Sequence, residues 1–111
     1  YFGQEDYLCE IQKSQSWNWS AIRPQAVCGL SIGNPLNLTS VVAVYAVISR
    51  ELGLPLRWPG KPDAFHTIYQ VTDYEILGKS MVWAATTPEC ANETFNIANG
   101  DVFRWDLRCL P

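Results

Sequence analysis

The segment from Thr94 to Trp105 is the part of the chain that most constrains the fold. It opens with Phe95 and Ile97 at alternating positions, the pattern of a short strand with one buried face. Residues 99–101 read Asn-Gly-Asp, which favours a tight turn and then the capping residue of a helix. A strand that leads through a turn into a helix is typical of a layered α/β protein rather than a β-sandwich or a helical bundle.

Three segments before this point are predicted to be helices, and in the first and third of them apolar residues share one helical face. They span residues 4–15, 37–53 and 72–86. The middle segment is rich in valine, a strand former, but it is long, begins at the capping residue Asn37 and ends at Gly53, a plausible C-cap. In the third segment, Thr72 and Glu75 have the spacing of a capping box.

Shorter segments between these helices are predicted to be strands. They are residues 17–22, residues 54–58 and, as a strand or an irregular segment, residues 64–70. Pro24 should end the first strand, because proline has no N–H to donate to a neighbour, and 25–36 should be a loop. The resulting alternation of helices and strands predicts an α/β fold built on a mostly parallel sheet.

Length and charge limit the class of protein. At 111 residues the chain is one domain at most, long enough for a hydrophobic core. The net charge is −3 and the basic residues are scattered, so we expect no nucleic-acid partner. The longest apolar run, 41–48, is far shorter than the roughly 20 residues that span a bilayer, so we expect a soluble, cytoplasmic protein. Because the chain opens on Tyr1 rather than Met, we expect a piece of a longer protein.

The cysteines leave two interpretations open. No pair has the C-x-x-C spacing of a zinc or thioredoxin-like site. We favour four buried, reduced thiols over two disulfides of a secreted protein. Three N-glycosylation sequons, at Asn18, Asn37 and Asn92, support the second interpretation, but two of them fall inside apolar patterns where a glycan has no room. The cysteines are Cys9, Cys28, Cys90 and Cys109.

The residues taken alone carry no complete active site. Gly29 and Gly33 do not match the G-x-G-x-x-G turn that binds dinucleotides, and there is no G-x-S-x-G, H-E-x-x-H or Walker A motif. His66, the single histidine, has no acid or nucleophile near it in the sequence and is expected to be structural.

Five motifs occur in one order over almost the whole chain. They are Tyr1-Phe-Gly-Gln-Glu-Asp6, Trp19-Ser-Ala-Ile-Arg-Pro24, Met81-Val-Trp-Ala-Ala85, Asn92-Glu-Thr-Phe-Asn96 and Asn99-Gly-Asp-Val-Phe-Arg-Trp105. In this order they resemble the C-terminal half of the progesterone 5β-reductase and iridoid synthase family, an atypical branch of the extended short-chain dehydrogenase/reductases. The resemblance implies a single partial domain over 1–111. This domain would be the substrate-side part of a Rossmann-like fold without its N-terminal nucleotide-binding turn.

The resemblance also implies a reaction. Such an enzyme uses NADPH, with NADH as the alternative, and reduces an enone C=C bond or a carbonyl by hydride transfer. In this register Tyr1 takes the catalytic tyrosine position, where its hydroxyl stabilises the charge that develops on the carbonyl oxygen; a shift of one residue would place Phe2 there. In the family, a lysine from an earlier segment assists the tyrosine. Residue 5 is Glu5, so the common Y-x-x-x-K version is absent.

The family resemblance assigns two further groups of residues. The loop that closes over the nicotinamide corresponds to Pro24, Ala26 and Val27, and the substrate pocket to Ala26 with three residues of the later segment: Phe65, Ile68 and Tyr69. Plant members tend to carry Asn at position 26 and Ser at position 69. The differences argue against a steroid or iridoid substrate and predict a more aromatic pocket for a small enone or another activated carbonyl compound.

Other interpretations stay open. A non-catalytic fragment or interaction module of the same fold would explain the missing cofactor half. A sugar-nucleotide epimerase or dehydratase shares the extended fold, and a secreted, disulfide-linked glycoprotein domain is the least favoured alternative. No metal is expected, and a homodimer is a further expectation.

Overall fold

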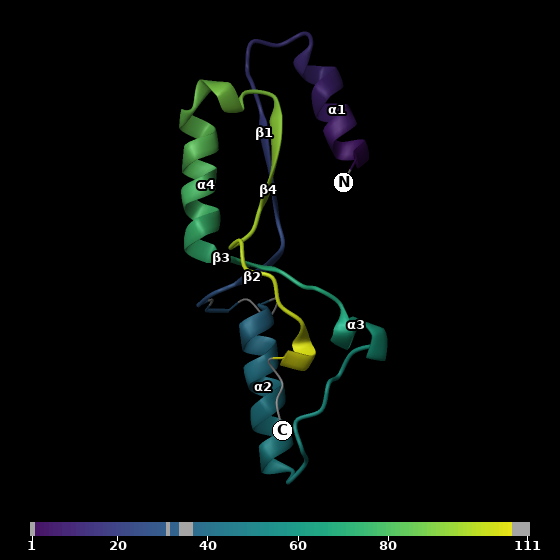
Figure 1. The fold of residues 1–111 in the computed structure, drawn as a ribbon. Helices are drawn as coiled ribbons and strands as arrows, with labels where there is room; N and C mark the ends of the chain where they lie inside the picture. The colour runs from purple at the N-terminus through teal and green to yellow at the C-terminus, as the bar shows by residue number, and fades with distance from the viewer. Residues whose placement is uncertain (1, 31, 34–36, 108–111) are drawn as a thin grey trace.

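The computed structural model describes residues 2–30, 32–33 and 37–107 (Figure 1). The described chain contains both helices and parallel strands, as predicted, with η1 and η2 being single 3₁₀ turns. In chain order the elements are α1 (Phe2–Gln12), β1 (Ser20–Pro24), β2 (Ala26–Cys28), α2 (Leu38–Glu51), α3 (Pro62–His66), β3 (Val71–Asp73), α4 (Tyr74–Thr86), η1 (Pro88–Cys90), β4 (Glu93–Ile97) and η2 (Trp105–Leu107).

The strands form two separate parallel pairs. β1 pairs with β4, from Ser20 opposite Glu93 to Pro24 opposite Ile97. β2 pairs with β3 over three positions. Because parallel neighbours need a long crossover connection, both pairs join segments far apart in the sequence. The predicted parallel α/β arrangement is therefore confirmed at the level of these small sheets.

Helix α4 packs against the β1–β4 pair, and α1 lies on the other side of the strands in the view of Figure 1. The Trp83 ring of α4 meets the Phe95 ring of β4 edge to face, with 4.9 Å between the ring centroids. Ala84 and Cys90 are buried beside them. This layer of one helix on two strands contains the buried apolar residues of the described chain.

Both predicted ends of the middle helix, α2, are confirmed. The Asn37 side chain accepts a hydrogen bond of 3.0 Å from the Thr39 N–H, as an N-cap does. At the other end Gly53 has φ of 65°, and the Leu54 N–H donates to the Ser49 carbonyl at 2.9 Å. This is the geometry of a Schellman C-cap. The valine-rich segment is therefore a helix, held by its caps despite its strand propensity.

The predicted capping box of α4 is wrong. The helix begins at Tyr74, and the Asp73 carboxylate accepts the Glu75 N–H at 2.8 Å. Thr72 lies in β3 and its hydroxyl bonds other segments. Asp73 is one residue closer to the helix and already fills the N-cap position, so Thr72 is free for a tertiary role.

Several predicted boundaries also change. Helix α1 covers Phe2–Gln12 rather than 4–15, and β1 covers Ser20–Pro24 rather than 17–22. The predicted loop after Pro24 contains β2, whose short sequence carries a weak strand signal and is held by pairing with β3. Residues 54–58 form no strand, since no described segment pairs with them.

Two further segments differ from the prediction. Within residues 64–70, the chain first completes the short helix α3 and then makes an isolated antiparallel bridge between Tyr69 and Phe103. No helix begins at Asp101, although Gly100 turns the chain with φ of 90°. The backbone of Phe103 is used by the bridge instead, which prevents a helix from starting before Trp105.

The described chain is elongated and exposes much apolar surface. Its radius of gyration is 18.4 Å, whereas a compact domain of about 100 residues has roughly 13 Å. Among the described residues, the buried hydrophobic ones are Ala84 and Cys90, while Leu30 is 84% exposed and Val44 58%. The length is sufficient for a hydrophobic core, but these residues do not build an extensive one by themselves.

In the described part of the chain, no helix is both long and apolar enough to cross a membrane.

Candidate functional site

The carboxyl ends of β1 and β4 meet at Pro24 and Ile97, directly before the small β2–β3 pair (Figure 1). Ligands of open parallel α/β sheets bind beyond the carboxyl ends of the strands. Pro24 is exposed there, and Ala26 and Val27 follow as half-buried residues of β2. The three predicted cofactor-binding residues therefore lie together at the end of the sheet where a ligand is expected.

A buried hydroxyl joins three segments at this end. The Thr72 side chain has no solvent exposure, and its Oγ1 donates to the Ile97 carbonyl at 2.7 Å. The same oxygen accepts the Gln25 N–H at 3.0 Å. Gln25 directly follows Pro24, so the hydroxyl fixes the backbone between β1 and β2 against the end of β4.

Asn99 extends this network. Its side-chain oxygen accepts the Asp73 N–H at 2.7 Å, and its own N–H donates to the Val71 carbonyl at 3.0 Å. Both ends of β3 are therefore bonded to the residue that begins the Asn-Gly-Asp motif. The motif serves the site by holding β3 in place rather than by starting a helix.

The backbone after β2 is fixed at Gly29. This residue has φ of 153°, and a Cβ at this position would overlap the Tyr74 ring, with Cε1 at 2.8 Å. The Gly29 carbonyl accepts a hydrogen bond from the Asn37 side-chain amide. Only glycine allows this close approach of the loop to the start of α4.

Helix α1 is tied to the end of β1 by charge. Arg23 Nε donates to Glu5 Oε1 at 2.8 Å, and Nη2 of the same guanidinium pairs with Oε2. The Arg23 guanidinium also lies over the Phe2 ring, 5.8 Å from its centroid. The first turn of α1 is thereby held beside the candidate site. Tyr1, the predicted catalytic residue, lies outside the described residues.

An aromatic cluster is formed by the segments around α3 and η2. Ring centroids are 5.7 Å apart for Trp58 and Phe65, 5.2 Å for Trp58 and Trp105, and 5.7 Å for Tyr69 and Trp105. Of the predicted substrate residues, Phe65 and Tyr69 belong to this cluster, whereas Ile68 is 68% exposed and does not. The aromatic cluster consists of Trp58, Phe65, His66, Tyr69, Phe103 and Trp105.

Sequence reasoning did not assign Trp58, Phe103 and Trp105 to the site. The available signal was the alternation of Phe103 and Trp105 around the charged Arg104, which is the pattern of an extended segment with one aromatic face. The Tyr69–Phe103 bridge, with hydrogen bonds of 2.7 and 3.1 Å, is what brings this face to Tyr69. A pairing over 34 positions of sequence cannot be read from local pattern.

His66 pairs with an acid that sequence reasoning also missed. Its Nδ1 lies 3.1 Å from Asp106 Oδ2, which links α3 to η2. Arg104 Nε lies 3.2 Å from the other oxygen of Asp106, close enough for charge attraction but not in hydrogen-bonding geometry. This contact joins the His66 edge of the aromatic cluster to the segment that carries Trp105, and the structural role expected for His66 stays a prediction.

An apolar groove adjoins the aromatic cluster. It has a volume of about 260 Å³ and lies between α2 and the segment that leads to α3. Trp58 and Trp105 belong both to the groove and to the cluster. Val41 and Tyr45 of α2 form part of the opposite wall. This surface suits an apolar part of a small molecule, with few polar groups to fix its orientation.

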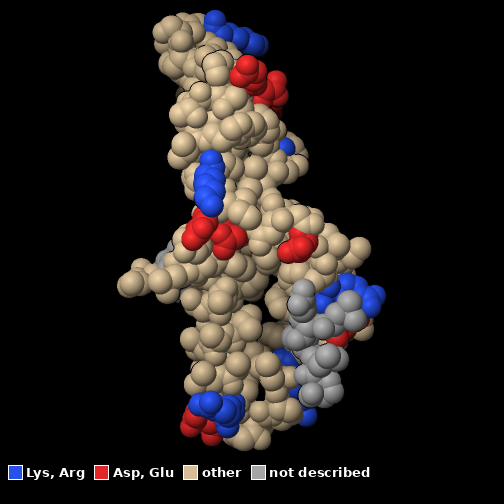
Figure 2. Space-filling model, turned by 60° about the vertical axis from the view of Figure 1, so that its left-hand side comes forward, with Lys and Arg blue, Asp and Glu red and all other residues tan. Residues whose placement is uncertain are grey.

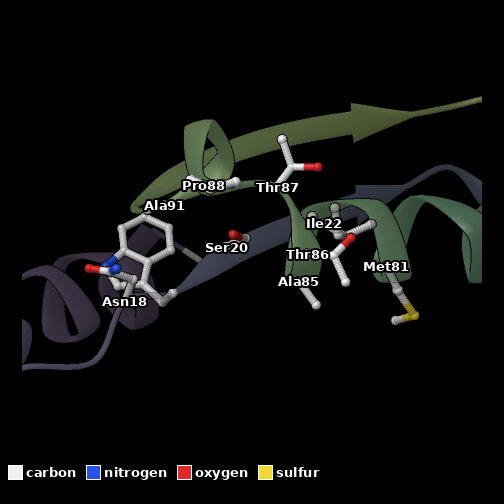
Figure 3. Close-up of a pocket in the computed structure, with 11 residues that line it drawn as sticks. Asn18, Ser20, Ile22, Met81, Ala85, Thr86, Thr87, Pro88 and Ala91 are labelled. Carbon is white, nitrogen blue, oxygen red and sulfur yellow. The ribbon is translucent and has the colours of Figure 1, made fainter.

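Another hollow, of about 750 Å³, lies elsewhere (Figure 3). It sits at the amino end of β1, between Ser20, Ile22 and the second half of α4. The Ser20 hydroxyl is already bonded to the Cys90 carbonyl at 2.6 Å. No ionisable side chain lines this hollow. It lies at the amino end of β1, whereas ligands of open parallel α/β sheets bind at the carboxyl ends of the strands, so we do not take it as the candidate site.

The described cysteines are Cys9, Cys28 and Cys90, and all three are free thiols. Cys90 is buried and Cys28 half-buried, but Cys9 is exposed, so the expectation of buried thiols is wrong for Cys9. Burial is the main cause that raises the pKa of the Cys90 thiol, and nearby Glu89 adds to it. Cys109 lies outside the described residues.

Three further features of the described residues concern a sequon, the possible metal ligands and the surface charge. Asn37 is 6% exposed, so a glycan has no room at that sequon. No group of His, Cys, Asp or Glu in the described ranges could hold a metal ion. On the face shown in Figure 2, the basic side chains stand singly or in small groups, several of them directly beside acidic ones. This face offers no basic patch of the kind that binds nucleic acid.

Comparison with models of known protein families finds no match. Individual relatives do match, over 95% of this chain in each case. The (S)-8-oxocitronellyl enol synthase of Nepeta racemosa is 40% identical over 27% of its length, and the 3-oxo-Delta(4,5)-steroid 5-beta-reductase of Arabidopsis thaliana is 36% identical over 27%. A short chain dehydrogenase of Penicillium aethiopicum is 36% identical over 28% of its length. The chain thus spans little more than a quarter of these relatives.

Proposed function

Because this chain belongs to the progesterone 5β-reductase and iridoid synthase family, we propose that it forms the substrate-side part of an NADPH-dependent short-chain reductase. NADH is the alternative nucleotide. The reaction is the reduction of an enone C=C bond or a carbonyl in a small molecule. The observation that supports the proposal is the junction at Thr72, whose hydroxyl is bonded to Gln25 of the predicted cofactor loop and which closely follows the segment of Phe65 and Tyr69.

The residues at the carboxyl end of β1 fit the nicotinamide end of such a nucleotide. Pro24 is exposed at the strand end, and Ala26 and Val27, which carry short apolar side chains, are half-buried in β2. NADPH, when bound, supplies a hydride. We assign Pro24, Ala26 and Val27 to holding the nicotinamide face, while the phosphates require a glycine-rich turn that this sequence does not contain.

The hydride acceptor, which is the enone or carbonyl substrate, is assigned to the part of the site next to the aromatic cluster. Ala26 is shared between the two parts of the site, and Phe65 and Tyr69 would provide aromatic walls for the enone. Ile68 is predicted to join them, although its side chain faces solvent in the described structure. The apolar groove next to Trp58 and Trp105 offers space for a hydrocarbon part of the substrate. The cytoplasmic location and the homodimer remain predictions.

Tyr1 is assigned the role of oxyanion donor in this reaction. Its hydroxyl would donate a hydrogen bond to the carbonyl oxygen of the enone while negative charge develops there. The Arg23–Glu5 pair and the Phe2 ring hold the following turn of α1 at the carboxyl end of β1. Support for this role comes from the sequence register together with that anchor of α1.

The test is NADPH oxidation by the full-length protein with a small enone, followed at 340 nm (the absorbance band of the reduced nicotinamide). Tyr1→Phe should lower kcat by about 100- to 1,000-fold, since removal of one oxyanion donor has effects of that order. Tyr7→Phe is the matched control, because Tyr7 lies on the same helix and is 63% exposed. An unchanged rate for Tyr1→Phe would remove this residue from the mechanism.

The same assay separates the alternatives. A full-length protein that binds neither NADPH nor NADH would support a non-catalytic module of the same fold. Turnover of a sugar nucleotide without net NADPH oxidation would support the epimerase or dehydratase alternative. A secreted, disulfide-linked domain gains no support from the three described cysteines, which are all free.

A further inference from the structure

Thr72 occupies an unusual position for a residue that the sequence predicted to cap a helix. It is the middle residue of β3 and is completely buried. Its hydroxyl makes no bond to α4 and instead contacts the backbone of two other segments, at Gln25 and Ile97. A buried hydroxyl that bonds only backbone groups of distant segments fixes their relative positions.

We propose that the Thr72 hydroxyl is a positioning group that couples the cofactor loop, residues 24–27, to the substrate segment, residues 65–71. This inference rests on the proposed function. The loop is bonded to the hydroxyl through the Gln25 N–H, and the substrate segment continues directly into β3, which carries the hydroxyl. The distance between the hydride donor and the acceptor carbon is set by these two segments, so their coupling bears on the reaction rate.

The hydroxyl is the central contact of the junction. The Gln25 N–H has one weaker second acceptor, the Ile97 carbonyl at 3.3 Å, compared with 3.0 Å for the hydroxyl. β2 and β3 share only three paired positions, so the ladder between them is short. Figure 1 shows both strands lying where β1 and β4 end. Without the hydroxyl, the only described bonds from the loop to β3 would be those of this short ladder, while Pro24 and Gln25 would stay bonded to β4 alone.

Thr72→Val tests the coupling in the full-length protein, because valine keeps the side-chain shape and removes the hydroxyl. We expect the KM for NADPH to rise about tenfold, with a comparable fall in kcat, since a slight misplacement of reacting groups has effects of up to a hundredfold. Thr72→Ser keeps the hydroxyl and should restore most of both values. Thr39→Val, which removes an exposed hydroxyl on α2, is the matched control and should change neither.

Hydrogen exchange gives a readout that does not depend on turnover. Thr72→Val should speed amide exchange both at Gln25 and in residues 69–71, whereas Thr72→Ser should not. If valine leaves the KM for NADPH and the exchange at both segments unchanged, the proposal is overturned. If exchange speeds up but the kinetics stay the same, the hydroxyl is merely structural and the positioning role is also overturned.

Failure of the proposed function looks different. In that case the wild-type full-length protein is folded but neither binds nor oxidises NADPH or NADH. The exchange comparison would then still decide whether Thr72 couples residues 24–27 to residues 69–71. Exchange that speeds up at Gln25 alone would show that the hydroxyl holds the loop but does not couple the two segments, and would overturn the proposal.

Discussion

Gly29 shows how much a single position contributes to the geometry of the candidate site. Its φ of 153° and its contact with the Tyr74 ring place the end of β2 against the start of α4. Its carbonyl is bonded by the Asn37 side chain, so the same residue also contacts the cap of α2. Gly29 thus determines how closely β2, α2 and α4 approach one another.

We expect Gly29→Ala to lower the free energy of unfolding of the full-length protein by about 1–3 kcal/mol, because overpacking adds to backbone strain. Urea unfolding measures this loss. Gly53→Ala is the control, since Gly53 also has positive φ, at 65°, but a Cβ there would meet no atom within 4 Å. Equal losses for the two variants would show that the Tyr74 ring moves aside at no cost.

At the scale of the elements, the ends of the helices follow rules that depend on residues close together in the sequence. The caps of α2, at Asn37 and Gly53, could be predicted because each uses the chemistry of its own residue. The cap of α4 could not be located to the residue, since Thr72 and Asp73 are both good capping residues and adjacent. Burial of Thr72 against Ile97 decides between them.

Replacement of the observed cap of α4, Asp73→Ala, should lower the free energy of unfolding of the full-length protein by about 1 kcal/mol. The reason is the loss of the bond of 2.8 Å from the Glu75 N–H. Asp101→Ala is the matched control: the sequence predicted a cap at Asp101, but no helix begins there and its side chain is exposed. A larger loss for Asp101→Ala in urea unfolding would contradict the structure.

Strands followed the sequence less closely than helices did. β4 was predicted from the alternation of Phe95 and Ile97, and it forms over Glu93–Ile97. β2 and β3 are three residues each and exist because they pair with each other. Since such pairing joins distant parts of the chain, the local pattern carries too little information to predict it.

The shape of the whole molecule explains why a chain of this length has a small interior. Its extents are 61 × 30 × 23 Å, and apolar side chains of α2 such as Val44, Val47 and Ile48 are about half exposed. The hydrophobic effect favours covering such surfaces, at roughly 25 cal/mol per Å². The arrangement of the described elements therefore leaves a large apolar surface uncovered.

We expect the 111-residue chain, expressed alone, to lack a cooperative urea transition and to bind the dye ANS, because it buries few apolar side chains. Circular dichroism should still show helical content, mainly from the capped helices. The full-length protein, measured in parallel, should unfold cooperatively and bind little dye. A sharp transition of the isolated chain, with a free energy of unfolding above about 5 kcal/mol, would contradict this expectation.

The candidate site could be predicted only in part. The order of motifs placed Pro24, Ala26, Phe65 and Tyr69 in it, and the structure brings the first two to the sheet end and the last two into the aromatic cluster. Trp105 and the Thr72 hydroxyl were missed because each acts through a partner distant in the sequence. Ile68 was assigned by resemblance, but exposure of its side chain depends on tertiary packing.

The sequence by itself determined the family, the caps of α2 and the strand before Asn99, since these depend on residue identity and on neighbours in the chain. Only the tertiary structure decided that Asn99 holds β3 rather than starting a helix, and that Thr72 joins the ends of β1 and β4 to the loop at Gln25. The physical reason is that a hydroxyl or amide bonds the nearest unsatisfied backbone group in space. In a parallel α/β arrangement that group often belongs to a segment far away in the sequence.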